Sequence, residues 1–344
     1  MIYHSSTLKV LLILVLGFGC SVKSPQNKEK HLTNLRQLTF GGENAEAYFS
    51  SDGKHLIFQA TRDEHICDQI FTMETTGKKI TQVSTGKGRT TCAYFLKDGA
   101  HFVYASTHLG NELCPAKPDY TKGYVWPVYP DYDLFLSDFK KQLTQLTSTA
   151  GYDAEATISP DGKKIVFTSV RDGDLELYTM NIDGSEVKRL TNKLGYDGGG
   201  FFSPNGKKIV FRAFHPTKKE EIDKYQTLLA QHLVEPKTLE IFVIDVTGNN
   251  QVQVTNNGAA NFCPFFHPDG NRIIFSSNLA DPSGRNFDLY LINVDGTQLE
   301  QITFEKTFDG FPMFSPDGKQ LVFASNRNGK VQGETNIFIA DWIE

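Results

Sequence analysis

Small oxygen-bearing side chains recur at one fixed distance from a repeated turn in this 344-residue chain. They lie six residues before the end of the strand that leads into each turn: Asn44, Thr90, Asp153, Asp197, Asn261 and Asp309. Oxygen atoms are the ligands that hard cations such as calcium take. If these positions converge, they could hold a cation or a polar ligand. The alternative is that Asp and Asn bond their own backbone and cap tight loops.

Two glutamates, Glu46 and Glu155, lie two positions after members of this set. The same offset holds different residues in the other copies: Cys92, Gly199, Cys263 and Phe311. Two carboxylates far apart in the chain make an acid–base pair only if the fold brings them to the right distance. The alternative is a pair of solvated charges. We therefore assign no catalytic residue.

Cysteines offer a second kind of chemistry. Besides Cys20, the chain has Cys67, Cys92, Cys114 and Cys263, and an even number in an exported protein suggests disulfides. We predict a Cys67–Cys92 bridge, because these two residues begin neighbouring strands. A metal site with His65 lacks the support of a Cys-x-x-Cys motif, so the metal remains unknown.

The motifs of several enzyme classes are missing. The chain has no Gly-x-Ser-x-Gly elbow, no His-Glu-x-x-His, no Walker loop and no dinucleotide fingerprint. A net charge of −5 and a pI near 6.0 also leave no basic stripe for nucleic acid.

The repeated turn shows which elements must position these residues. Pro fixes its first dihedral angle, Asp or Asn tolerates the second corner and Gly accepts a positive φ. Its six copies are Ser51-Asp52-Gly53, Lys97-Asp98-Gly99, Ser159-Pro160-Asp161-Gly162, Ser203-Pro204-Asn205-Gly206, His267-Pro268-Asp269-Gly270 and Ser315-Pro316-Asp317-Gly318. Short β-rich runs flank each copy, so each reads as a hairpin.

The unit from Asp153 to Asn192 predicts four strands, at 156–159, 164–169, 175–181 and 187–191. Third strands are apolar on both faces, which indicates sheets sandwiched between neighbouring sheets. Six four-stranded antiparallel blades packed radially form an all-β propeller. The last unit lacks a fourth strand, and residues 35–39 match one, so we expect the N-terminal strand to complete that blade.

Two units carry long insertions between their second and third strands, at residues 107–131 and 215–237. These loops and the blade-to-blade loops emerge on one rim, where we expect the polar ring and the ligand-binding site. The first insertion includes Tyr124 and Trp126, which could stack on sugar or peptide or pack as a lid. The second predicts an amphipathic helix at 219–233, which packs on the propeller or recognises a partner.

The order Leu-Thr, Ser-Pro-Asp-Gly-Lys and Ile-Val-Phe is similar to the TolB-type propeller repeat, and the resemblance covers residues 35–344. It implies a six-bladed propeller, a fold that serves both binding proteins and enzymes. The family's namesake has an α/β domain before the propeller, whereas a short linker precedes Leu35 here. A role in the Tol system is therefore not expected.

Residues 1–19 have one lysine, an apolar run and small residues before Cys20, which predicts a secretory signal peptide. Cys20 resembles the lipidated cysteine of bacterial lipoproteins. Residues 20–34 are polar and predict a flexible tether. We expect a periplasmic or surface-exposed body held at the outer membrane by the lipid.

The first functional hypothesis is a non-enzymatic, envelope-tethered propeller that binds a protein or peptide partner and needs no cofactor. The second is a polysaccharide-active enzyme, by resemblance to oligogalacturonate lyase, or a glycan-binding protein with calcium at the rim.

Overall fold

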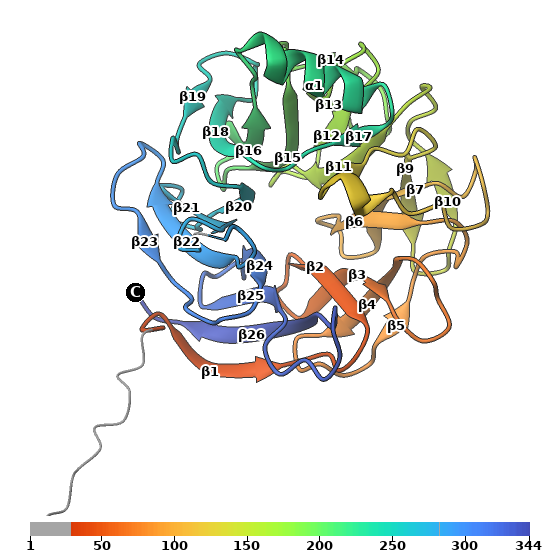
Figure 1. Cartoon of the computed structure of the whole chain (residues 1–344). Helices are drawn as coiled ribbons and strands as arrows, with labels where there is room; N and C mark the ends of the chain where they lie inside the picture. The colour runs from red at the N-terminus through yellow and green to blue at the C-terminus, as the bar shows by residue number, and fades with distance from the viewer. Residues whose placement is uncertain (1–28, 282) are drawn as a thin grey trace, which may run out of the picture.

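The computed structural model describes residues 29–281 and 283–344. Six four-stranded antiparallel sheets are arranged around a central axis (Figure 1). This arrangement confirms the predicted six-bladed propeller. The predicted signal peptide, Cys20 and residues 21–28 of the predicted tether lie outside the described residues.

Each blade has its first strand at the axis and its last at the outside. Blade 1 consists of β2 (Glu43–Phe49), β3 (His55–Thr61), β4 (Gln69–Glu74) and β5 (Thr81–Gln82). Blade 2 consists of β6 (Thr90–Phe95), β7 (His101–Ser106), β9 (Asp133–Asp138) and β10 (Leu143–Gln145). Blade 3 consists of β11 (Asp153–Ile158), β12 (Lys164–Ser169), β13 (Glu176–Asn181) and β14 (Lys188–Arg189). Blade 4 consists of β15 (Tyr196–Phe202), β16 (Lys208–Phe214), β18 (Glu240–Asp245) and β19 (Val252–Gln253). Blade 5 consists of β20 (Asn261–Phe266), β21 (Arg272–Ser277), β22 (Asp288–Asn293) and β23 (Glu300–Gln301). Blade 6 consists of β24 (Asp309–Phe314), β25 (Gln320–Ser325), β26 (Asn336–Trp342) and β1 (Leu32–Gln37).

The Pro-Asp-Gly turn is held by its own side chains. Ser159 Oγ donates to Asp161 Oδ1 at 2.6 Å, and the same oxygen accepts the N–H of Lys163 at 3.1 Å. Gly162 has φ 78°, which other residues resist. The bonds recur at the equivalent Ser50, Ser203 and Ser315. The hairpin is therefore encoded locally.

The last blade is closed by the N-terminal strand, as predicted. In β1, Leu32 pairs with Trp342 of β26 and Gln37 with Phe338. The strand begins at Leu32 and so includes the last three residues of the predicted tether. Closure leaves no third strand exposed at the joint between the two ends of the chain.

Buried apolar side chains of the middle strands pack between blades. Val166 and Leu177 of blade 3 form one cluster with Ile209 and Phe211 of blade 4, and all four are fully buried. The third strand of blade 3 thus uses one of its two predicted apolar faces against blade 4.

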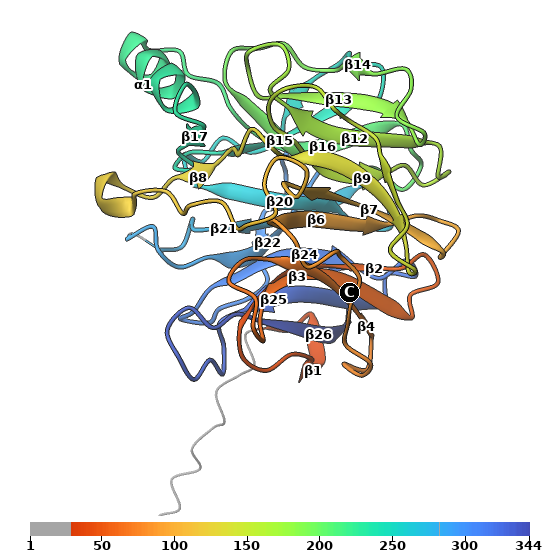
Figure 2. The ribbon, with the colours of Figure 1, turned by 90° about the vertical axis from the view of Figure 1, so that its right-hand side faces the viewer.

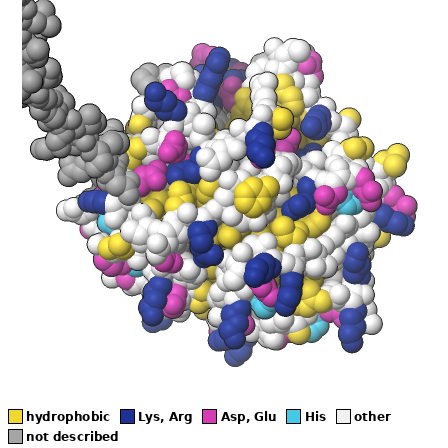
Figure 3. Space-filling model, turned by 90° about the horizontal axis from the view of Figure 1, so that it is seen from below, with side chains coloured by type: hydrophobic (Ala, Val, Ile, Leu, Met, Phe, Trp, Pro, Cys, Tyr) yellow, Lys and Arg dark blue, Asp and Glu magenta, His cyan; other side chains and the backbone are white. Residues whose placement is uncertain are grey.

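The disc has two different faces. One carries the Pro-Asp-Gly turns, and the other carries the loops that join second to third strands and one blade to the next; we call the second the insertion face. In Figure 2, α1 (Lys219–Leu229) and the segments β8 (Trp126–Pro127) and β17 (Leu233–Val234) project from it. On the side seen in Figure 3, basic and acidic side chains are interspersed. Among the described residues, no helix is both long and apolar enough to cross a membrane.

Candidate functional site

All six innermost strands carry a β-bulge at the same point. The bulged residues adopt a left-handed backbone, with φ from 50° to 63°, and they are Glu46, Cys92, Glu155, Gly199, Cys263 and Phe311. A bulge re-aims its side chain out of the regular alternation. All six line one cavity on the axis, so we call them the bulge ring. The position in the repeat that Glu46 and Glu155 share is thus the position whose side chains face the channel.

An aromatic plug closes the channel below the bulge ring. Tyr48 and Phe201, from blades 1 and 4, meet with ring centroids 5.5 Å apart. Tyr94 lies 6.2 Å and Phe265 5.4 Å from the same phenylalanine. These residues lie two positions after the ring members of their strands. The cavity of about 1500 Å³ above them is therefore a blind funnel that opens on the insertion face.

Arg212 of β16 lies beside the bulge ring and lines the funnel, and sequence analysis missed it. Arg212 is 7% exposed, and its guanidinium occupies the space in front of Gly199, where any Cβ would overlap Nη1. Nη2 donates to Tyr196 Oη at 2.5 Å and forms an ion pair with Glu155. The available signal was a charged residue inside the apolar run Ile209 to Phe214, which buried strands seldom carry unpaired.

Glu155 is fully engaged in this cluster. Its Oε2 accepts from Thr168 Oγ1 at 2.7 Å and from the N–H of Gly199 at 2.9 Å, while Oε1 meets Arg212. The indole ring of Trp126 lies 5.2 Å from the guanidinium carbon of Arg212. The first insertion therefore rests on the ion pair.

Glu46 differs from Glu155 because, within the described residues, it has no ion-pair partner. Its Oε2 accepts from Tyr48 Oη at 3.5 Å. Burial, together with the charges of Glu155 and Asp68, raises the pKa of Glu46 to about 7 although Cys92 and Arg212 act the other way. The funnel thus holds one carboxyl that titrates near neutral pH.

The two thiols of the bulge ring are not activated. Burial raises the pKa of Cys92 and of Cys263 well above the ordinary thiol value, and the nearby Glu46 acts in the same direction. Because the thiolate is the nucleophile, neither cysteine is suited to covalent chemistry at neutral pH.

The six polar residues that we expected to ring the channel mouth do not form a ligand shell. All are at most 1% exposed, and of the six only Asn44 lines the funnel. Three of them bind a basic side chain 18 residues later: Asp153 with Arg171 at 3.0 Å, Asp197 with His215 at 2.8 Å and Asp309 with Arg327 at 2.6 Å. Asn44 and Asn261 bond the main-chain oxygens of Thr335 and Leu239. The three aspartates thus hold loops of their own blades, whereas Asn44 and Asn261 each hold a loop of the preceding blade. Among the described residues, no group of three or more His, Cys, Asp or Glu could hold a metal ion.

The two insertions join above blade 3. Leu233 pairs with Pro127 and Val234 with Trp126, so β8 and β17 form a two-stranded ribbon. The predicted helix ends at Leu229, because the residues that follow enter this ribbon. Tyr225 anchors the helix: it is 5% exposed and its hydroxyl donates to Asp174 at 2.5 Å. The helix packs on the propeller.

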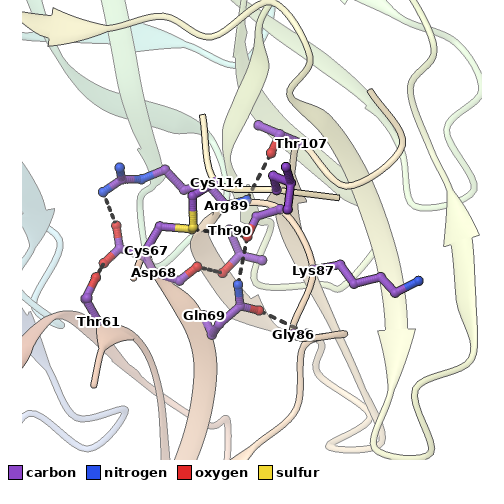
Figure 4. The surroundings of a disulfide bond; sticks show 12 residues. Thr61, Cys67, Asp68, Gln69, Gly86, Lys87, Arg89, Thr90, Thr107 and Cys114 are labelled. Atoms are coloured by element: carbon purple, nitrogen blue, oxygen red, sulfur yellow. Dashed lines mark hydrogen bonds and ion pairs between the residues drawn. A yellow bond between two sulfur atoms is a disulfide. The ribbon is translucent and has the colours of Figure 1, made fainter. Parts of the chain in front are cut away.

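The predicted Cys67–Cys92 disulfide is wrong. Cys67 is bonded to Cys114 of the first insertion, with Cα atoms 6.0 Å apart, and Cys92 is free in the bulge ring. Figure 4 shows the bridge beside Asp68, which accepts from Thr61 at 2.7 Å and pairs with Arg89 at 2.6 Å. The bridge does fasten blade 1 to blade 2, but it does so through the insertion, whose path the sequence did not reveal.

The mouth of the funnel carries exposed apolar side chains. Tyr124 is 68% exposed and stacks on Tyr120 at 6.3 Å, and its hydroxyl accepts the indole N–H of Trp126 at 3.1 Å. Loops of blades 1, 2, 5 and 6 add further exposed residues on the same face: Ile66, Leu109, Leu113, Leu279 and Val331. Exposed apolar side chains that share one face can serve as an interaction surface.

Comparison with known families gives one match, to the TolB beta propeller domain, over residues 131–227 and 226–339. Among solved structures, the chain is similar to a putative TolB from Agrobacterium tumefaciens, with a TM-score of 0.59 and 18% identity over 90% of this chain and 94% of that one. It is also similar to TolB from Acinetobacter baumannii, with a TM-score of 0.58 and 20% identity, and covers 64% of that protein against 88% of its own length.

An oligogalacturonate lyase in complex with manganese is similar as well, with a TM-score of 0.52 and 16% identity over 90% of this chain and 93% of that one. At these identities the similarity establishes the fold and does not distinguish a binding protein from an enzyme.

Proposed function

Since this chain belongs to the TolB beta propeller domain family, we propose that it is a non-enzymatic binding protein that takes a protein or peptide partner on its insertion face. We further propose that a lipid on Cys20 tethers it to the outer membrane, with the body in the periplasm or at the cell surface.

The observation that carries this proposal is a blind funnel with an apolar mouth. A cavity of about 1500 Å³ can hold several side chains of a bound segment, and the exposed Tyr120 and Tyr124 line it. Inside, Glu155 is neutralised by Arg212, and the thiols are protonated. The funnel therefore has groups for recognition but no activated nucleophile among its described residues.

Crosslinking in intact cells tests the proposal. A photoreactive amino acid at Tyr124 should trap a specific envelope protein, to be identified by mass spectrometry. Phe139 is the matched control, because it is 46% exposed on the opposite face, in the turn between β9 and β10. Equal adducts from both positions, or none from Tyr124, would contradict the proposal.

A glycan is the second candidate, favoured by one observation. The stacked, exposed Tyr120 and Tyr124 offer flat aromatic faces of the kind that bind sugar rings. Oligogalacturonide binding or cleavage that depends on stoichiometric calcium or manganese in the purified protein would support this candidate over the first.

A further inference from the structure

We propose that the floor of the funnel is a subsite for one cationic group, an ammonium or guanidinium carried by the bound partner, which pairs with Glu46. The subsite rests on the proposed function, since the cation belongs to that partner.

At the floor of the funnel, two of the three carboxylates have an ion-pair partner. Arg212 neutralises Glu155, and Arg89 neutralises Asp68 at 2.6 Å. Glu46 is the remaining charged group of the bulge ring, and among the described residues it has no ion-pair partner. When ionised it gives the floor a net charge of one negative unit, which a single cation balances.

Arg212 cannot take the place of that cation. Its Nη2 is committed to Glu155 and Tyr196, and its guanidinium is held 5.2 Å from Trp126 and 5.4 Å from the ring of Tyr196. The fixed guanidinium forms one side of the subsite. An anionic ligand gains little from it, because its charge is already satisfied.

The walls suit a cation as well as its carbon chain. Tyr48, Tyr94 and Phe201 belong to the plug below the bulge ring, and Tyr152 and Tyr196 line the funnel. Aromatic faces attract ammonium and guanidinium groups, most strongly where water is excluded. A lysine or arginine side chain, or a free amino terminus, can therefore enter with its charge toward Glu46.

The pH dependence follows from the groups that surround Glu46. Those that influence its charge are Glu155, Asp68, Arg212, Cys92, Tyr48 and Cys263. Because its pKa is about 7, the carboxyl is mostly protonated at pH 6 and mostly ionised at pH 8. A cation should bind about tenfold more weakly at pH 6 than at pH 8.

The test uses 2-phenylethylammonium as the probe and 2-phenylethanol, which lacks the charge, as its control. Calorimetry on the full chain should show the ammonium binding with the tenfold pH dependence and the alcohol binding more weakly without it. Glu46→Gln should lower the ammonium affinity at pH 8 by about tenfold or more and remove the pH dependence. Glu235→Gln is the matched variant, because Glu235 also lines the funnel but pairs with Lys224 at its mouth.

A second readout needs no variant. In the wild-type protein, carbon NMR of the Glu46 carboxyl should show its pKa falling when the ammonium probe is added. An unchanged pKa, equal binding of the alcohol, or retained pH dependence in Glu46→Gln would each overturn the subsite. Crosslinking at Tyr124 reports separately on the protein partner, so either proposal can fail alone.

Discussion

At the scale of single residues, the charge inside the funnel depends on the side chains that the β-bulges turn inward. Glu46 and Glu155 occupy equivalent positions in their strands. Glu155 forms an ion pair with Arg212, whereas Glu46 accepts a hydrogen bond from the neutral Tyr48. Burial raises the free energy of an ionised carboxylate, and it does so more when the carboxylate has no ion-pair partner. The two glutamates therefore differ in charge behaviour although the sequence gives them the same place.

Replacing Glu46 should stabilise the protein at high pH. Its folded-state pKa is raised from 4.5 to about 7, so the unfolded chain loses the proton first and stability falls as pH rises through that window. Glu46→Gln removes this loss and should raise the free energy of unfolding by about 1–3 kcal/mol at pH 8, with no gain near pH 4.5. Urea unfolding across this pH range is the measurement. A difference that stays constant with pH would contradict the assignment to Glu46.

Gly199→Ala should break the Arg212 cluster. The new methyl group overlaps Nη1 of Arg212, and the residue also has φ +63°. Gly99→Ala is the matched control, since Gly99 has φ +66° with nothing within 4 Å of an added Cβ. Chemical denaturation should show Gly199→Ala less stable than Gly99→Ala by about 1–3 kcal/mol. Equal losses would mean that backbone strain alone accounts for the effect.

At the scale of elements, the two insertions form the wall of the funnel above blade 3. The β8–β17 ribbon joins them, Tyr225 fastens the helix, and the Cys67–Cys114 bridge ties the first insertion to blade 1. The ribbon joins the insertions of blades 2 and 4, and the other two contacts reach blade 3 and blade 1. The mouth is therefore held at three points, while the exposed Tyr124 remains available to a ligand.

Loss of the bridge should release the first insertion. Because it closes a loop with a sequence separation of 47, Cys114→Ser should cost about 2–4 kcal/mol of unfolding free energy. Denaturation with and without reductant measures this: reductant should bring the wild type to the level of the variant. The free Cys92 provides the control, since Cys92→Ser should keep the full response to reductant.

At the scale of the whole molecule, the ring depends on closure between the two ends of the chain. β1 supplies the outer strand of a blade whose other strands come from the C-terminus, and His31 bonds the main-chain oxygen of Ile343 at 2.7 Å. An edge left open there would offer unpaired backbone groups to other chains.

Removal of residues 1–37 should open the last blade. We expect lower thermal stability and concentration-dependent association, because β26 then becomes an exposed edge. Removal of residues 1–28 is the control, since it leaves β1 intact. Light scattering during size-exclusion chromatography distinguishes the two. A monomeric, equally stable protein after the longer deletion would show that closure by β1 is dispensable.

The membrane anchor is a separate prediction at the same scale. If Cys20 is lipidated, fractionation should find the wild type with outer membranes and Cys20→Ser in the soluble envelope fraction, with the same thermal stability once purified. Recovery of both proteins in the same fraction would speak against the anchor.

The sequence by itself determined the repeat, and with it the fold. The Pro-Asp-Gly turn is satisfied by atoms within a few residues, as Ser159 and Asp161 show, so it can be read locally. Apolar third strands and the spare strand near Leu35 then indicate six blades and their closure. The offset of Glu46 and Glu155 also identified channel-facing positions, because every blade has its bulge in the same place.

Only the tertiary structure decided what those positions do. Asp153 and Asp197 were expected to face the mouth, but each is buried and paired with a basic residue 18 positions later in the chain. Cys67 is bonded to Cys114 and not to Cys92, and Arg212 occupies the space that the missing side chain of Gly199 leaves free. Such pairings depend on the path of irregular loops and on space left by a neighbouring blade. Both are set by contacts between distant parts of the chain, which periodicity and composition do not record.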